Sequence, residues 1–262
     1  MTRKIWGGIL LFFITGAIQA QLVNIESIRM HTDSARFVLK SDVLFNYTNT
    51  DGTYIYRFNL SLNTQYKTEN LKNIFFFSGN AELIRSQDQD FQNGWFVHLR
   101  YNRKLGEREK LRMEAFVQDQ NNALLSINER NLVGLGLRYK FVKKGLFHAY
   151  LGNSYMYEKE VSNAVNQKYY NHRNSSYLSL TLNFKESELE LINTVYFQPL
   201  YTDISNFRVL EQFKAEMPLF KKIKASVLFN YFYNNLNPYG TSEFTSVFSV
   251  GFTYEFVSES KK

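Results

Sequence analysis

Most of this sequence consists of long segments in which large apolar residues alternate with small or polar ones. The segment "FTSVFSVGFTYEF", residues 244–256, is the clearest: one set of alternate positions is nearly all Phe, Val and Tyr, and the other nearly all Thr, Ser, Gly and Glu. Successive side chains of a β-strand point to opposite faces, so a period of two predicts a strand with one apolar face. Because no window past residue 35 sustains the helical period, the sequence predicts an all-β fold.

Twelve such segments, separated by turn residues, follow one another from residue 35. They span residues 35–48, 53–65, 72–85, 93–105, 111–122, 129–142, 145–157, 175–184, 188–197, 207–218, 222–235 and 243–257. The third segment is ambiguous in facing and the ninth is poorly patterned, so counts of ten or fourteen strands stay open. The composition favours strands, since the chain has 24 Phe and 18 Tyr and only three Pro.

A soluble β-sandwich also shows a period of two. The lengths of the segments and connections and the charges on the polar faces distinguish a membrane barrel from it. The segments often exceed the ~5 to 6 residues usual in soluble sheets, and their polar faces carry charges of both signs. Short connections, such as 106–109 and 143–144, alternate with longer ones, above all 158–174. That alternation and an even strand number are typical of outer-membrane barrels. We therefore predict a closed antiparallel transmembrane β-barrel of about twelve strands in a bacterial outer membrane, closed because an open edge would leave unpaired backbone groups in lipid.

The N-terminus has the pattern of a cleavable signal peptide. Arg3 and Lys4 precede the apolar run "IWGGILLFFITGA", and small Ala20 precedes Gln21. The predicted organisation is a signal peptide at 1–20, a short periplasmic segment at 21–34, the barrel at 35–257 and a polar tail at 258–262.

Charge and cysteine content exclude several classes of protein. Cleavage of the signal peptide lowers the count of Lys and Arg from 31 to 29, against 24 Asp and Glu, which is a modest excess. Because the basic residues form no block, nucleic-acid binding is not expected. The chain has no Cys, which excludes a disulfide framework.

The polar faces supply the candidate functional residues, because they face the lumen if the apolar faces meet lipid. The candidate lumen-lining residues are Arg57, His98, Arg100, Arg112, Glu114, Arg138, Lys140 and Glu255, and the same facing predicts inward positions for Lys40, Asp42, Glu188, Glu190, Arg208, Lys214 and Glu216. A pore with a cationic lining would mildly prefer anions, and the residues of that lining would be Arg57, Arg100, Arg138 and Lys140. Alternatively, the charges pair with one another and fill a narrow barrel. Gly134 and Gly136 are expected to make room for bulky neighbours or to permit coiling of the strand.

Catalytic and metal sites have weak signals. His172 and Ser175, which could suggest a barrel lipase, are three residues apart and point to opposite faces if extended. Asp88 and Asp90 could suggest a barrel protease, but no His follows an Asp by two residues, as the D-x-H pattern of such a protease requires. Neither His98 nor His148 has a second metal ligand at strand spacing. We therefore predict no enzyme, no catalytic residue, no cofactor and no metal.

Three stretches resemble the YdiY-like family, often described as salt-induced outer membrane proteins and classed as a domain of unknown function. They are "FNYTNTDGTYIYRFNLSL" at 45–62, "NERNLVGLGLRYKFV" at 128–142 and "NPYGTSEFTSVFSVGFTYEF" at 237–256. The resemblance implies a monomeric outer-membrane barrel without established activity, and it implies no catalytic residues.

The expected function is a structural or permeability role in the outer membrane, and two alternatives stay open. The first is a narrow channel for small anions or oligosaccharides, and the second is a barrel enzyme. The expected partners are outer-membrane lipids, lipopolysaccharide and, during biogenesis, the barrel assembly machinery. The closing strand resembles the aromatic-rich terminal signal that this machinery recognises, although six residues follow Phe256.

Overall fold

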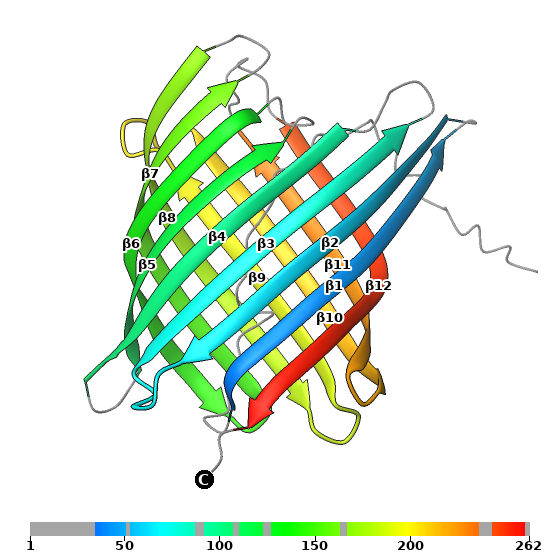
Figure 1. Ribbon diagram of the computed structural model, residues 1–262. Helices are drawn as coiled ribbons and strands as arrows, with labels where there is room; N and C mark the ends of the chain where they lie inside the picture. The colour runs from blue at the N-terminus through cyan, green and yellow to red at the C-terminus, as the bar shows by residue number, and fades with distance from the viewer. Residues whose placement is uncertain are drawn as a thin grey trace, which may run out of the picture.

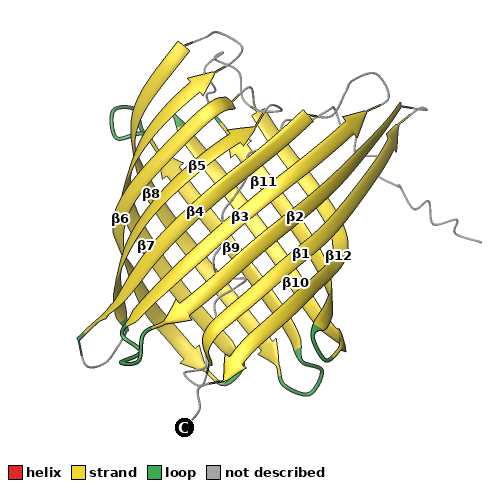
Figure 2. Cartoon of the chain, in the orientation of Figure 1, coloured by secondary structure: helices red, strands yellow, loops and turns green. Residues whose placement is uncertain are grey.

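The chain forms a closed barrel in which every strand is antiparallel to its neighbours (Figure 1). The computed structural model describes residues 35–50, 53–86, 92–106, 110–122, 127–162, 167–235 and 243–259. The strands are β1 (Ala35–Thr50), β2 (Thr53–Lys67), β3 (Asn73–Ser86), β4 (Gln92–Leu105), β5 (Leu111–Asn122), β6 (Ile127–Lys144), β7 (Phe147–Ser162), β8 (Gln167–Phe184), β9 (Leu189–Pro199), β10 (Phe207–Phe220), β11 (Ile223–Asn234) and β12 (Glu243–Glu259). The predicted all-β barrel of twelve strands is confirmed within these ranges (Figure 2).

The seam between β1 and β12 closes the ring. Their paired residues run from Ala35 opposite Glu259 to Phe45 opposite Val250. Gly251 lies opposite Leu44, and a Cβ added to it would lie 2.0 Å from the carbonyl oxygen of Val43. The two backbones can approach this closely only because residue 251 has no side chain.

Large apolar side chains cover the outside of the barrel. Residues on the outward face of the strands, such as Leu135, Leu151, Phe248 and Phe252, expose about half or more of their surface. Exposed apolar area on this scale is typical of a surface that meets lipid. Within the described residues, no helix has the length and apolar character to cross a membrane.

The strands are longer at the loop end than the alternation predicted. Residues 158–174 were predicted as a long outer loop, but β7 continues to Ser162 and β8 begins at Gln167, with these two residues paired (Figure 1). The prediction of this loop was wrong because the segment is as polar as a loop. Strand residues that lie outside the apolar layer of the membrane do not face lipid, so they need no apolar side chains. At the opposite end of the barrel, near the turns, β12 continues two residues past Val257. The predicted signal peptide, the segment 21–34 and residues 260–262 lie outside the described residues.

The facing of β3, which was ambiguous in the sequence, is clear in the structure. Ile74, Phe76 and Ile84 are buried on the inside, whereas Phe75 and Leu83 are exposed on the outside. The inner face of β3 combines these apolar side chains with the buried polar Ser78 and Glu82, so both faces carry large apolar residues and the alternation was hard to interpret.

Candidate functional site

The interior of the barrel is filled by buried polar and charged side chains. Several of them expose no more than 1% of their surface, including Lys40, Glu114 and Arg138. The charges form three groups, which we name by their height between the short turns and the long loops: the lower, central and upper networks. Burying charges in this way is tolerable only when each charge has partners.

The lower network lies near the turns and joins five consecutive strands. Its members are Lys40 and Asp42 of β1, Glu190 of β9, Lys214 and Glu216 of β10, Lys224 of β11 and Glu255 of β12. The Nζ of Lys40 lies 2.9 Å from the carboxylate of Glu216 and 3.2 Å from that of Glu255. The Nζ of Lys214 lies 2.8 Å from Asp42 and 2.6 Å from Glu216. Three cations and four carboxylates are thus held in one connected cluster.

The central network surrounds the carboxylate of Glu114 on β5. Asn102 donates a hydrogen bond to its Oε1 and Tyr177 of β8 donates one to its Oε2, both over 2.7 Å. A guanidinium nitrogen of Arg100 lies 3.4 Å from the same carboxylate, and the guanidinium lies 4.9 Å from the centre of the Phe116 ring. Glu114 is therefore paired with the cationic Arg100 and oriented by the neutral donors Asn102 and Tyr177.

The upper network lies near the loops. Glu158 and Glu160 of β7 contact Arg130 of β6, Arg173 of β8 and Arg208 of β10. Arg208 spans both carboxylates, with one nitrogen 2.6 Å from Glu158 and the other 3.2 Å from Glu160. Three guanidinium groups against two carboxylates leave this network with one excess positive charge.

All three networks cross the lumen. Lys40 on β1 reaches Glu216 on β10, Tyr177 on β8 reaches Glu114 on β5, and Arg208 on β10 reaches Glu158 on β7. In each pair, two other strands lie between the partners around the ring. Such partners can meet only through the interior, so each contact is a strut inside the barrel that joins strands three positions apart in the ring.

The structure places the candidate lumen-lining residues at different points of this interior. His98, Arg100 and Glu114 lie together in the central network, and Glu255 belongs to the lower network. The guanidinium of Arg138 packs 3.8 Å from the centre of the Tyr150 ring.

The remaining candidates lie on β2, β5 and β6. Arg57 on β2 attracts Glu82 on β3, and Arg112 lies directly opposite Arg138 across β5 and β6. Lys140 lies at a register shift near the lower end of β6. Glu188, which was predicted to face the lumen, is exposed in the turn between β8 and β9 with φ of 50°. That prediction was wrong because the turn extends one residue further than the alternation suggested.

Four residues of the upper network were missed by the sequence analysis. Glu158, Glu160 and Arg173 fell in the segment predicted as a loop, and Arg130 lies near the start of its strand. The sequence did contain a signal for these residues. Glu158 and Glu160 are two positions apart, so both carboxylates lie on one face if the segment is a strand.

Two aromatic rings pack inside the barrel over glycines. A Cβ on Gly134 would lie 2.1 Å from the ring of Phe116, and one on Gly152 would lie 2.0 Å from the ring of Tyr177. A Cβ on Gly136 would lie 2.2 Å from the Oγ of Ser154. Gly134 and Gly136 therefore make room for neighbours, as predicted.

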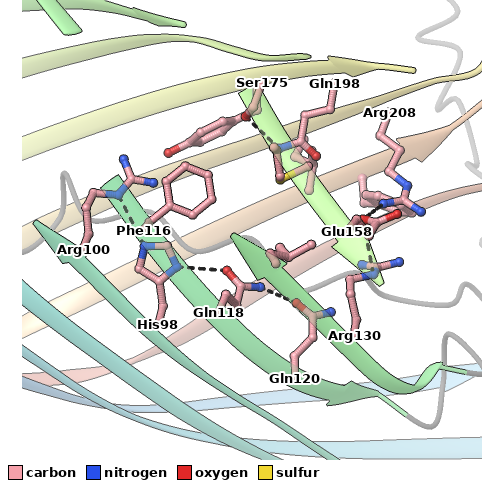
Figure 3. A pocket seen from close by; sticks show the side chains of 15 residues that line it. His98, Arg100, Phe116, Gln118, Gln120, Arg130, Glu158, Ser175, Gln198 and Arg208 are labelled. Carbon is pink, nitrogen blue, oxygen red and sulfur yellow. Dashed lines mark hydrogen bonds and ion pairs between the residues drawn. The ribbon is translucent and has the colours of Figure 1, made fainter. Parts of the chain in front are cut away.

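A small cavity of about 60 Å³ lies between the central and upper networks (Figure 3). Its lining includes His98, Arg100, Gln120, Arg130 and Arg208. Binding pockets for drug-sized ligands occupy roughly 300 to 1,000 Å³, so this space is too small for a sugar. A wider hollow of about 360 Å³ lies at the turn end, beside Glu188, Lys224 and Glu255.

Of the residues considered for catalysis, His172 and Ser175 do not form a catalytic pair. His172 is exposed on the outer face and bonds the hydroxyl of Tyr155, whereas Ser175 is buried on the inner face and accepts a hydrogen bond from Gln198 over 3.0 Å. Asp88 and Asp90 lie outside the described residues. Among the residues that are described, no group of three or more His, Asp or Glu could hold a metal ion.

Comparisons with known proteins agree with this architecture. A family model described as "Protein of unknown function, DUF481" matches residues 32–256. Among solved structures, an outer membrane channel from Pseudomonas putida F1 is similar with a TM-score of 0.53 at 8% identity, over 90% of this chain and 100% of that chain. The NanC porin gives a TM-score of 0.49 at 13% identity, over 82% of this chain and 98% of that chain. No protein with curated annotation matches the sequence.

The cellular location follows from the fold and the outer surface together. A closed barrel satisfies every backbone hydrogen bond within the sheet, and an apolar outer face is stable only against lipid. The protein is therefore an integral barrel of a bacterial outer membrane.

Proposed function

Because the chain belongs to the DUF481 family, which includes the YdiY-like proteins, we propose for it a structural role in the outer membrane, as a barrel that is closed to solutes of sugar size. The family has no established activity, so the proposal rests on the interior of this chain. The single observation that carries it is the set of struts across the lumen.

The struts support closure because opening them is energetically expensive. Removing one partner of a buried ion pair costs on the order of 3 to 5 kcal/mol, since the other charge stays buried without compensation. A solute would have to displace several such contacts at three heights to pass, including those of Lys40, Glu114 and Arg208. The paired charges therefore support an interior that stabilises the barrel wall and does not conduct solutes.

The second candidate is a narrow channel that prefers anions. Its cationic lining would consist of Arg57, Arg100, Arg138 and Lys140, and the similar barrel from Pseudomonas putida F1 is described as an outer membrane channel. The ion pair between Arg100 and Glu114 weighs against it, because a paired cation attracts a passing anion weakly.

Planar-bilayer recordings on the refolded protein test the choice. We expect the wild-type protein to show no stepwise conductance across a range of salts, and the Arg100→Glu and Arg138→Glu variants to give no ordered change in ion selectivity. Reproducible wild-type conductance steps whose anion preference falls in both variants would overturn the closed barrel and support the channel.

The protein has no proposed catalytic activity, and its proposed partners follow from its surface. We infer that it is a monomer whose outer face contacts lipid and whose loop end meets lipopolysaccharide. During biogenesis the barrel assembly machinery would handle the chain through the aromatic strand β12.

A further inference from the structure

The cavity between the central and upper networks has an excess of hydrogen-bond donors and positive charge. Its charged lining consists of the guanidinium groups of Arg100, Arg130 and Arg208 against the single carboxylate of Glu158. Guanidinium groups only donate hydrogen bonds. Arg100 is paired with Glu114, and Arg130 and Arg208 are paired with Glu158 and Glu160, so the excess beside the cavity is the one positive charge of the upper network. The other acceptors of the lining are neutral side chains such as Gln118 and Gln198.

A chain of hydrogen bonds with a defined direction leads into the cavity (Figure 3). The Nε of Arg100 donates to the Nε2 of His98 over 3.3 Å, so the imidazole proton lies on Nδ1. That Nδ1 donates to the Oε1 of Gln118 over 3.0 Å. The Nε2 of Gln118 then donates to the Oε1 of Gln120. Each donor in such a chain polarises the next, so the positive end of the chain is the amide nitrogen of Gln120.

The last donor of this chain has no acceptor. Among the described residues, the Nε2 of Gln120 and the Nε of Arg208 are buried without a hydrogen-bond partner. Gln120 exposes 1% of its surface and Arg208 exposes 5%, and both line the cavity. Gln120 also lies directly opposite Arg130 across β5 and β6, so donors of two neighbouring strands face one space. A buried donor without a protein acceptor is explained by strain or by a bound ion or water, and here both donors line the same cavity.

We propose that this cavity binds one small oxyanion, such as inorganic phosphate or a short carboxylate. Its oxygens accept from the Nε2 of Gln120 and the Nε of Arg208, and its charge balances the excess of guanidinium groups. A volume of about 60 Å³ holds about five water-sized groups, which matches phosphate or acetate and excludes a sugar acid. The site requires no conduction through the lumen, so it stands whether or not bilayer recordings show a current.

Equilibrium dialysis with labelled phosphate on the refolded full-length barrel tests the site, with acetate as the competing carboxylate. The anion is present during refolding, so slow entry into the lumen does not hide binding. We expect saturable binding of one phosphate per chain, displaced by acetate. The Gln120→Glu variant should bind at least about tenfold more weakly, because a carboxylate replaces the donor at the end of the chain.

This variant is chosen because it should fold. The introduced carboxylate retains the oxygen that accepts from Gln118, and its charge lies opposite Arg130, which stabilises a cross-strand pair. Gln212→Glu on the inner face of β10, outside the cavity lining, is the matched control and should keep its affinity within about twofold. Heat-modifiable gel mobility verifies that each barrel is folded. Folded wild-type protein without saturable binding of either anion, or equal affinity in Gln120→Glu, would overturn the proposal.

Discussion

Replacing Glu216 with glutamine is expected to lower the free energy of unfolding by about 3 to 5 kcal/mol. Glu216 exposes 1% of its surface and lies 2.6 Å from the Nζ of Lys214, 2.9 Å from that of Lys40 and 3.7 Å from that of Lys224. The amide keeps the shape of the side chain but removes the carboxylate that two buried ammonium groups share, and its NH2 group sets donors against them. Lys40 then retains Glu255 and Lys214 retains Asp42 as ion-pair partners. Urea titration of the barrel refolded into lipid vesicles measures the change.

The same substitution at the surface provides the control. Glu69 contacts Arg36 at 3.4 Å, but its side chain is 87% exposed. Exposed ion pairs contribute about 0 to 1 kcal/mol, so Glu69→Gln should leave the stability nearly unchanged. If both variants lost the same small amount, the lower network would not hold the wall together as described.

An arginine on the outside of the barrel is expected to destabilise the protein in lipid by about 2 to 4 kcal/mol. Leu135 lies midway along β6, between Ala115 of β5 and Tyr155 of β7, and exposes 56% of its surface. Leu135→Arg moves a guanidinium into the centre of the apolar face, where lipid offers no hydrogen-bond acceptors. The free energy of unfolding from vesicles provides the measurement.

A second arginine tests whether depth in the membrane is the cause. Tyr170 exposes 58% of its surface, but it lies near the loop end of β8, opposite Lys159. Arginine near the membrane surface costs about 0 to 1 kcal/mol, so Tyr170→Arg should have a small effect. An equal loss at both positions would contradict a lipid belt centred on Leu135.

The fold was largely predictable because successive residues of a strand face lipid and the interior in turn. Lipid requires apolar side chains, whereas the filled interior of this barrel is mostly polar. In β12, Phe248, Val250 and Phe252 alternate with Ser249, Gly251 and Thr253, and this alternation alone indicates the strand and its facing. The prediction failed for the parts of the strands that extend beyond the apolar layer. Beyond the apolar layer, β7 and β8 need no apolar outer face, so their continuation was taken for a loop.

The sequence predicted which candidate residues face the interior, but it did not predict which of them contact one another. Alternation assigns Lys40, Glu114 and Arg208 to one face of their strands, but it says nothing of which side chains meet across the barrel. The pairing of Lys40 with Glu216 joins residues 176 positions apart and depends on strand tilt and barrel circumference. The cavity near Gln120 depends further on the direction of hydrogen bonds, which no sequence pattern contains.

Closure of the ring at the seam of β1 and β12 is the central claim, and a disulfide tests it most directly. Val43 lies opposite Phe252 in this seam, and both side chains are exposed on the outer face. Directly opposed residues of antiparallel strands have Cα atoms about 4.5 to 5.5 Å apart, which suits a disulfide. The chain has no native Cys, so Val43→Cys with Phe252→Cys introduces a single pair.

We predict that this double variant forms an intramolecular disulfide on mild oxidation of the refolded barrel in lipid vesicles, as detected by gel mobility with and without reductant. The pair Val43→Cys with Phe248→Cys, displaced by four residues or about 13 Å along β12, should stay reduced under the same conditions. Absence of the first disulfide in folded protein, or equal oxidation of both pairs, would contradict the closed barrel and its register.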